Sequence, residues 1–396
     1  MPYFDDRARL SAAFSTLTSG SSGSVLSDDS IEITRFPFSS AQNSDLFAFE
    51  ESLPEGFGPN STHLLAIGDP AVQENFCFDY FVVRSASTRR STGAIFLFHG
   101  LNEKSWDKYL PWAKLLALRT GKAVMLFPIA FHMNRAPAEW SNPRAMMRVA
   151  AERRAAYPGE SSISFVNAAL SSRLQFGPQR LFSSGLQTYD DVVALVDQLR
   201  SGSHPLFVRS PTVDFFGYSI GAFLTEILLM QNPGNLFGSS RAVLFCGGTT
   251  LGSMSPVSRF IMDGEASRQV AGYYGSQLQG GESLSGVLRK VVNRMQSLGT
   301  LFLSMLFNDK LKGYRDAQLA SVGNRLQAIA LRQDRVMPAP RVAETLEIAR
   351  SSARVTLLDF PFPYTHEQPF PLLDRFRTEI DEAFELVFRR AALTLS

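Results

Sequence analysis

Three residues in the second half of the chain could together form an activated nucleophile, and they occur in the order Ser219, Asp334, His366. Ser219 lies at the centre of residues 217–221, which read G-x-S-x-G. A serine hydroxyl becomes an effective nucleophile when a neighbouring base, usually histidine, takes its proton. A carboxylate behind the imidazole fixes its tautomer and orientation. The expected chemistry is attack on a carbonyl carbon through an acyl-enzyme intermediate.

The sequence around the serine predicts the sharp turn that this chemistry requires. Residues 212–216 are β-branched and aromatic, which favours a strand, and residues 222–230 are rich in strong helix formers. A serine between a strand and a helix, flanked by glycines, is typical of a nucleophile elbow. The backbone N–H of Ile220 then points toward the reacting carbonyl and is expected to stabilise the oxyanion.

The candidate acid and base each follow a predicted strand. Asp334 comes just after residues 326–331, and His366 follows residues 354–360. Functional side chains in open α/β sheets gather beyond the carboxyl ends of the strands, so both residues can reach the serine. Asp359 is the rival acid, but it lies inside a predicted strand run and not after it.

His366 is the only one of the five histidines that follows the last predicted strand. His63 precedes the predicted core, and His204 lies in a crossover loop, so both fit surface or capping roles. His99 fits packing or the shaping of its loop. His132 follows a core strand and could enter the site.

A second oxyanion donor is expected from residues 98–102, Phe-His-Gly-Leu-Asn, which follow a predicted strand at residues 94–98. The Leu101 N–H is the first choice and the Asn102 N–H is the second. Side-chain identity cannot decide between the two, because the donor is a backbone group.

Three residues that follow the predicted strand at residues 123–129 are candidate substrate contacts: His132, Asn134 and Arg135. They must lie near the same sheet edge as the serine. Arg135 could bind a substrate carboxylate, although a structural salt bridge is the alternative interpretation.

These motifs resemble those of the α/β-hydrolase superfamily, over roughly residues 76 to 390. Residues 98–102 are similar to the family's His-Gly oxyanion segment, and the order of nucleophile, acid and base is also that of the family. The resemblance implies an α/β fold with a mostly parallel central sheet flanked by helices. It implies a serine hydrolase that cleaves an ester or related acyl bond. A closer likeness, to bacterial hydrolase-like proteins of unassigned function, implies no substrate.

The positions of the predicted elements suggest how the chain is organised. Strands and helices alternate from residue 94, which is typical of a parallel sheet with helices on both faces. Two connections are too long for simple crossovers and predict mainly helical insertions that cover the site. The expected parts are an N-terminal extension at 1–75, a core at 76–132, 186–248 and 323–396, and insertions at 133–185 and 249–322.

The N-terminal extension does not read as part of the hydrolase-like core. Residues 19–24 have the composition of a Ser/Gly-rich linker. Short elements at 31–38 and 46–49 are expected to pack on the outside, and residues 76–83 are expected to form an edge strand.

The composition is that of a globular protein without a polyanionic partner. The 396 residues carry 39 basic and 37 acidic side chains, so the net charge of +2 predicts no nucleic-acid partner. The N-terminus lacks the apolar run of a signal peptide. The apolar run at 298–307 is too short for a membrane span. We therefore expect a cytoplasmic location.

The cysteines and histidines indicate which ligands to expect. Cys77 and Cys246 lie in strand-like apolar runs and are expected to be buried free thiols. No Cys/His cluster has the spacing of a zinc site, and the serine chemistry needs no cofactor. The expected partner is a small-molecule acyl substrate with an apolar acyl group, and the oligomeric state stays open.

Other functions share these features. A binding protein that keeps the fold without catalysis is one alternative, although such proteins usually lose a member of the Ser/Asp/His set. An acyltransferase or peptidase would use the same residues. Esters, thioesters, amides and lactones are not separated by the motif.

Overall fold

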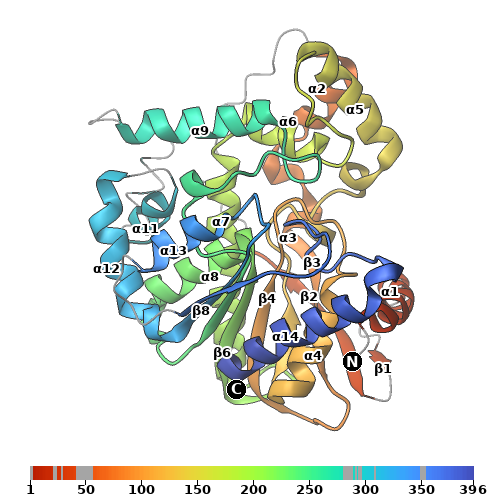
Figure 1. Cartoon of the computed structure of the whole chain (residues 1–396), viewed down its shortest axis with the longest axis vertical. Coiled ribbons are helices and arrows are strands. Elements are labelled where there is room, and N and C mark those ends of the chain that lie inside the picture. Colours follow the sequence, from red (N-terminus) through yellow and green to blue (C-terminus); the bar gives the residue numbers. More distant parts are fainter. Residues whose placement is uncertain are drawn as a thin grey trace.

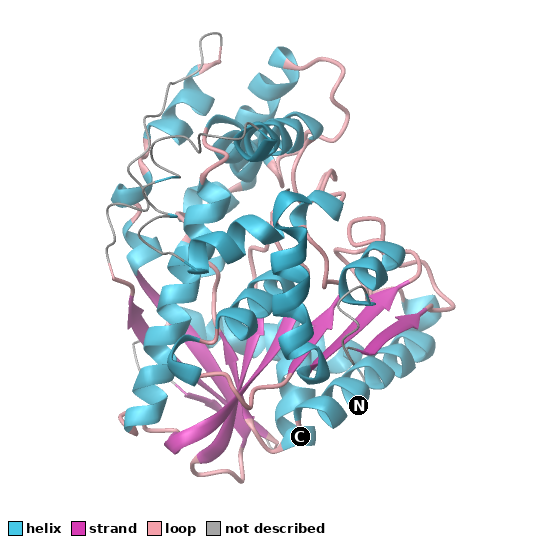
Figure 2. Ribbon diagram, turned by 90° about the vertical axis from the view of Figure 1, so that its left-hand side faces the viewer, coloured by secondary structure: helices cyan, strands magenta, loops and turns pink. Residues whose placement is uncertain are grey.

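A computed structural model of the chain describes residues 3–20, 25–27, 30–41, 57–279, 289, 292, 297–306, 309–347 and 354–396. Its centre is a twisted nine-stranded sheet with helices on both faces, and further helices lie beyond one end of the strands (Figures 1 and 2). The strands are β1 (Val25–Ser27), β2 (Ile31–Ser39), β3 (Cys77–Ser85), β4 (Ser91–Phe98), β5 (Ala123–Leu126), β6 (Phe207–Tyr218), β7 (Ala242–Phe245), β8 (Leu326–Leu331) and β9 (Arg354–Leu358).

The order of the strands across the sheet is β1-β2-β3-β5-β4-β6-β7-β8-β9. The six strands from β5 to β9 in this order are parallel, whereas β3 is antiparallel to β5 and to β2, and β1 is antiparallel to β2. The non-consecutive order around β4 arises from helical crossovers between parallel strands. This mostly parallel, helix-flanked sheet confirms the predicted α/β-hydrolase fold.

The main helices account for both covering layers and for the region beyond the sheet edge. They are α1 (Tyr3–Ser19), α2 (Pro59–Ala66), α3 (Gln73–Phe76), α4 (Tyr109–Thr120), α5 (Pro143–Ala156), α6 (Ala168–Phe176), α7 (Arg180–Ser201), α8 (Ile220–Gln231), α9 (Gly264–Gln279), α11 (Ser297–Met305), α12 (Lys312–Val322), α13 (Ala339–Glu347) and α14 (Arg377–Leu395).

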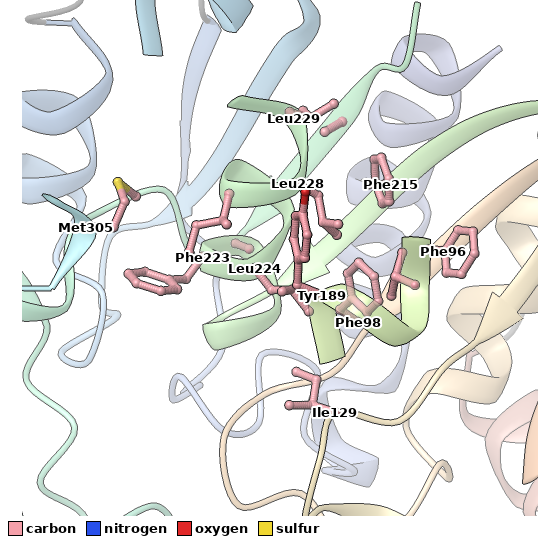
Figure 3. Packing of buried hydrophobic residues seen from close by; sticks show 14 of the residues in the cluster. Phe96, Phe98, Ile129, Tyr189, Phe215, Phe223, Leu224, Leu228, Leu229 and Met305 are labelled. Carbon is pink, nitrogen blue, oxygen red and sulfur yellow. The ribbon is translucent and has the colours of Figure 1, made fainter. Parts of the chain in front are cut away.

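Two hydrophobic cores form because successive side chains of a strand point to opposite faces of the sheet. Phe96 and Phe98 of β4 belong to the core under α7 and α8, where Leu228 packs (Figure 3). The alternate β4 residues belong to the other core, where Trp112 of α4 and Phe388 of α14 have ring centroids 5.3 Å apart. The sheet is thus held between two helical layers, which gives its carboxyl edge a rigid base.

The N-terminal residues are part of this architecture, contrary to the prediction that residues 31–38 pack on the outside. These residues form β2, which pairs with β3 over nine positions, so β3 is an interior strand and not an edge strand. It was hard to predict that these residues belong to the sheet, because Pro37 has no backbone N–H to donate to a neighbouring strand. The proline is tolerated because β1 pairs only with residues 32–34, which leaves β2 outermost at Pro37.

The expectations for the two cysteines have different outcomes. Cys77 was expected to be buried but is exposed at the first position of β3, whereas Cys246 is buried, and both thiols are free. The predicted element at residues 46–49 and most of the predicted linker lie outside the described residues.

Helices α5, α6 and α9 lie beyond the carboxyl ends of the strands, above the sheet in Figure 1, whereas α11 and α12 pack against α8. All five belong to the two insertions at residues 133–185 and 249–322. A buried ion pair joins them: Arg153 of α5 donates from Nε and Nη2 to both oxygens of Asp263, at 2.9 and 2.8 Å. Asp263 also caps α9 by accepting from the Ala266 N–H. Because both charged side chains are fully buried and paired, we expect the two insertions to behave as one covering unit.

Within the described ranges, no helix combines the length and apolar character required for a bilayer crossing.

Glu226 of α8 is a buried acid whose two carboxylate oxygens have no hydrogen-bond partner among the described residues. Burial raises the pKa of Glu226 well above its ordinary value, although the charge of Arg315 opposes this. A raised folded-state pKa means that the folded protein binds a proton that the unfolded chain releases. Stability is therefore lost as pH rises above the ~4.3 typical of an unfolded glutamate.

We expect Glu226→Gln to raise the unfolding temperature at pH 8 and to flatten its decline between about pH 5 and pH 8. Thermal unfolding at a series of pH values measures this. Glu382→Gln, at an exposed position of α14, is the matched control and should leave the decline unchanged. An equal slope for wild type and Glu226→Gln would show that Glu226 does not couple folding to protonation.

Candidate active site

Ser219 lies in a strained turn between β6 and α8. Its φ of 58° and ψ of −119° are rarely adopted by residues with a side chain, and such strain is commonly stored at functional sites. The flanking glycines are required by space: a Cβ on Gly217 would lie 2.6 Å from the Ala222 Cα, and one on Gly221 would lie 2.6 Å from the Phe98 carbonyl oxygen. The predicted elbow is therefore present, with strand and helix in close contact around the serine.

The three residues predicted to act together form one continuous hydrogen-bond chain. The Ser219 hydroxyl lies 2.7 Å from His366 Nε2, and His366 Nδ1 lies 2.8 Å from Asp334 Oδ2. All three side chains are buried. Because an ionised carboxylate can only accept, the imidazole donates from Nδ1, which leaves the Nε2 lone pair for the serine proton.

Asp334 is held by the turn that follows β8. Its Oδ1 accepts from the backbone N–H groups of Val336 and Met337, at 2.9 and 2.8 Å. These bonds occupy one carboxylate oxygen and leave Oδ2 for the imidazole. The turn therefore orients the carboxylate independently of His366.

The rival acid Asp359 makes different contacts. It accepts from the Tyr364 hydroxyl at 2.9 Å and from the Gln333 amide at 3.2 Å, and it pairs with Arg332. The hydrogen bond from Tyr364 is the largest of the effects that lower the pKa of Asp359. Asp359 therefore supports the loop that carries His366, and the geometry favours Asp334 as its partner.

A cavity of about 200 Å³ adjoins the serine. Ser219, Ile220 and Leu101 all line it, so the two amides predicted to bind an oxyanion belong to residues around the same space. Ile220 is the first residue of α8, where backbone N–H groups lack partners within the helix. This arrangement can accommodate a carbonyl oxygen beside the nucleophile.

Asn102 is the second choice for the oxyanion donor, and its side chain has a structural role. Its Nδ2 donates to the carbonyl oxygens of Val166, at 3.0 Å, and Phe260, at 2.6 Å. These acceptors belong to the two insertions. The side chain thus ties the loop after β4 to both of them.

His99 shapes the same loop, as its position predicted. The Ile129 N–H donates to His99 Nε2 at 2.9 Å, so Nδ1 carries the proton and donates to the Gly100 carbonyl at 2.8 Å. Burial lowers the pKa of His99 well below its ordinary value. The ring is therefore a neutral structural link.

The candidate substrate contacts after β5 separate into three environments. Arg135 is fully buried and pairs with Asp191 at 2.8 Å, so its proposed role in binding a substrate carboxylate is wrong and the salt-bridge interpretation holds. Asn134 donates to the Asp79 carbonyl at the exposed surface. His132 lines a smaller chamber beside the serine cavity, and burial lowers the pKa of His132 to about 4.

The structure also identifies a positioning residue that sequence reasoning missed. The Tyr218 hydroxyl donates to the His366 carbonyl, and the two rings stack with centroids 5.4 Å apart. Lys108 Nζ lies 4.6 Å from the centre of the Tyr218 ring and donates to the Glu367 carbonyl at 3.0 Å. Tyr218 directly precedes Ser219, but its contact with a loop 148 residues away left no signal in the sequence.

We expect Tyr218→Phe to reduce kcat roughly tenfold with little change in KM, because it removes one hydrogen bond that holds the base while keeping the ring. Rates are to be expressed per active site titrated with a fluorophosphonate. Tyr80→Phe, which removes a buried hydroxyl bonded to His204, is the matched control and should keep kcat near wild type. If Tyr218→Phe lowers only the titratable fraction, Tyr218 supports folding and does not position His366.

Cys246 lies beside Asp334 and has a positive φ of 48°. Its sulfur, a carboxylate oxygen of Asp334 and a ring nitrogen of His366 lie within 4.8 Å of one another, the one such trio found in the described ranges. Burial raises the pKa of the Cys246 thiol well above its usual value. Because metals bind the thiolate, a neutral buried thiol is a poor ligand, and the trio fits better as packing around Asp334.

The fold and the site define a protein of the α/β-hydrolase fold with a Ser-His-Asp arrangement at the carboxyl edge of its sheet. The chain belongs to the family DUF6051, a family of unknown function whose model matches residues 1–396. No curated protein sequence matches it.

Solved structures with a similar fold include several esterases. Carboxyl esterase 2 from Tuber melanosporum is 14% identical, with 98% of each chain covered and a TM-score of 0.47. A thermostable esterase from Pseudomonas putida is 11% identical, with 100% of this chain and 91% of that chain covered and a TM-score of 0.44. An esterase from Pyrobaculum calidifontis is 12% identical, with 80% of each chain covered and a TM-score of 0.40. At this distance the function has to be inferred from the site.

Proposed function

We propose that the protein is a serine hydrolase that cleaves an ester or related acyl bond. The observation that carries this proposal is the hydrogen-bond chain from Ser219 through His366 to Asp334, built on a strained elbow beside a cavity. A serine that only forms a turn has no need of a buried imidazole and carboxylate behind it. Burying both groups stabilises the protein little, so catalysis is the better explanation.

The geometry supports a two-step reaction. His366 Nε2 takes the Ser219 proton as Oγ attacks the carbonyl carbon, and Asp334 stabilises the imidazolium that forms. The Ile220 and Leu101 N–H groups bind the oxyanion. His366 then returns the proton to the leaving group, and water attacks the acyl-enzyme by the same route. These steps need no metal or cofactor.

The surroundings of the serine favour an uncharged substrate. Its cavity is walled by apolar side chains of the second insertion, among them Ile261, Met262 and Val270, and by Leu181 of the first. A charged acyl group would lose its hydration without gaining a partner there. We therefore expect an uncharged substrate beside Ser219, with an apolar acyl group.

A fluorophosphonate probe on the purified full-length protein tests the proposal. The probe forms a covalent bond only with an activated serine, and peptide mapping should locate the label on Ser219. Hydrolysis of 4-nitrophenyl acetate should stop in proportion to labelling. An unlabelled protein that hydrolyses no activated ester would instead support a binding protein that keeps the fold without catalysis.

A further inference from the structure

A smaller apolar chamber adjoins the cavity beside Ser219. The two spaces share the walls formed by Leu101, Leu181, Ile220 and Leu251. The chamber has a volume of about 40 Å³, against 200 Å³ for the cavity at the serine. Both residues proposed as oxyanion donors therefore lie in the wall common to the two spaces, so a carbonyl bound there is next to the chamber.

The chamber disfavours charged groups as well as long ones. Ile129, Phe223 and Leu224, which are labelled in Figure 3, line it together with other apolar side chains. Its one titratable wall residue is His132, which is neutral near pH 7 because burial lowers the pKa of His132 to about 4. A charged group would lose its hydration on entering the chamber, so we expect only an uncharged group there.

Phe302 of α11 lines the chamber. Its side chain is buried, and its ring lies 5.5 Å from the Phe182 ring and 6.5 Å from the Phe223 ring, centroid to centroid. Opposite Phe302, helix α7 carries Gly185, where a Cβ would lie 2.8 Å from the Phe302 Cε1. The aromatic ring thus occupies the space that the missing side chain of Gly185 leaves.

We infer that the substrate carries a short, uncharged acyl group of about two to four carbons and that Phe302 sets this limit. This inference rests on the proposed hydrolase function. A water-sized group needs roughly 10–15 Å³ of such volume, so the chamber holds about three groups beyond the carbonyl. The leaving group then occupies the remainder of the serine cavity.

Kinetics on 4-nitrophenyl esters of acetate, butyrate, hexanoate and octanoate test the inference. For the wild type, kcat/KM should fall at least tenfold from butyrate to octanoate. Phe302→Ala should raise the octanoate-to-butyrate ratio at least tenfold, because a pocket discriminates each methylene by roughly 10- to 200-fold. Phe260→Ala is the matched control: its ring belongs to the same insertion but is half exposed and lines neither space, so the ratio should not change.

Gly185→Ala gives an independent test in the opposite direction, because Phe302→Ala removes buried packing and can unfold α11. Alanine is favoured over glycine in a helix, so the backbone of α7 should tolerate the change, but the Phe302 ring has to shift away from the new Cβ. The new methyl presses on the Phe302 ring and narrows the chamber, and the butyrate-to-acetate ratio of kcat/KM should fall at least threefold. Rates are expressed per site titrated with the fluorophosphonate.

The outcomes separate this inference from the proposed function. If no ester is hydrolysed and no serine is labelled, the hydrolase proposal fails. If esters are hydrolysed with equal kcat/KM from acetate to octanoate, the short-acyl inference is overturned and the hydrolase proposal stands. The inference is also overturned if Phe302→Ala and Gly185→Ala change selectivity only across a series of acetates with longer alcohols, since the chamber would then hold the leaving group.

Discussion

Replacing Ser219 with alanine is expected to abolish ester hydrolysis and fluorophosphonate labelling while leaving the fold intact. The Ser219 Oγ is the proposed attacking atom, and the loss of a triad nucleophile can lower turnover by up to ~10⁶-fold. The strained backbone at φ 58° does not depend on the hydroxyl, and alanine keeps the Cβ that the turn already accommodates. Measured turnover should fall to the background rate.

Far-ultraviolet circular dichroism and the unfolding temperature of Ser219→Ala verify that the loss is chemical. Ser203→Ala changes an exposed serine and is the matched control, with expected wild-type turnover. A Ser219→Ala protein that keeps more than a few per cent of wild-type kcat, or that still binds the probe covalently, would place the nucleophile elsewhere.

Asp334→Asn is expected to lower kcat by about 10⁴-fold with a much smaller effect on KM, as for the carboxylate of a comparable triad. Asparagine can keep the Oδ1 that accepts from the Val336 and Met337 N–H groups, so the turn should survive. Its Nδ2 then faces His366 Nδ1 and donates to it. This forces the imidazole proton onto Nε2, which can no longer accept the serine proton.

The comparison that decides this prediction is Asp359→Asn, a matched change in the rival acid. Asp359 contacts Tyr364 and Gln333, so its variant should keep kcat within a few fold of the wild type. Steady-state kinetics on both purified variants measure the difference. The reverse pattern would assign the acid to Asp359 and contradict the hydrogen bond from His366 to Asp334.

Much of the fold was predictable from local sequence because its elements are separated by strong local signals. Strand β8 begins and ends at the predicted residues, and Gly121 ends α4 in the left-handed conformation that favours glycine. The position of β2 was not predictable. A strand that contains Pro37 becomes part of a sheet only through its pairing with β3, which lies far along the chain.

By itself, the sequence determined which residues are candidates for the chemistry and the edge at which they meet. A G-x-S-x-G segment between strand and helix, and an acid and a histidine that each follow a later strand, are local patterns. The parallel sheet brings such positions together, and the structure places Ser219, His366 and Asp334 in hydrogen-bond contact.

Only the tertiary structure decided what surrounds those residues. It paired Arg135 with Asp191, placed Tyr218 under His366 and set Phe302 against Gly185. Each of these contacts joins segments far apart in the chain, and its energy depends on burial that no single segment possesses. Local patterns specify which strands and helices form, whereas the shape and charge of a cavity arise from side chains that meet only when the helices pack.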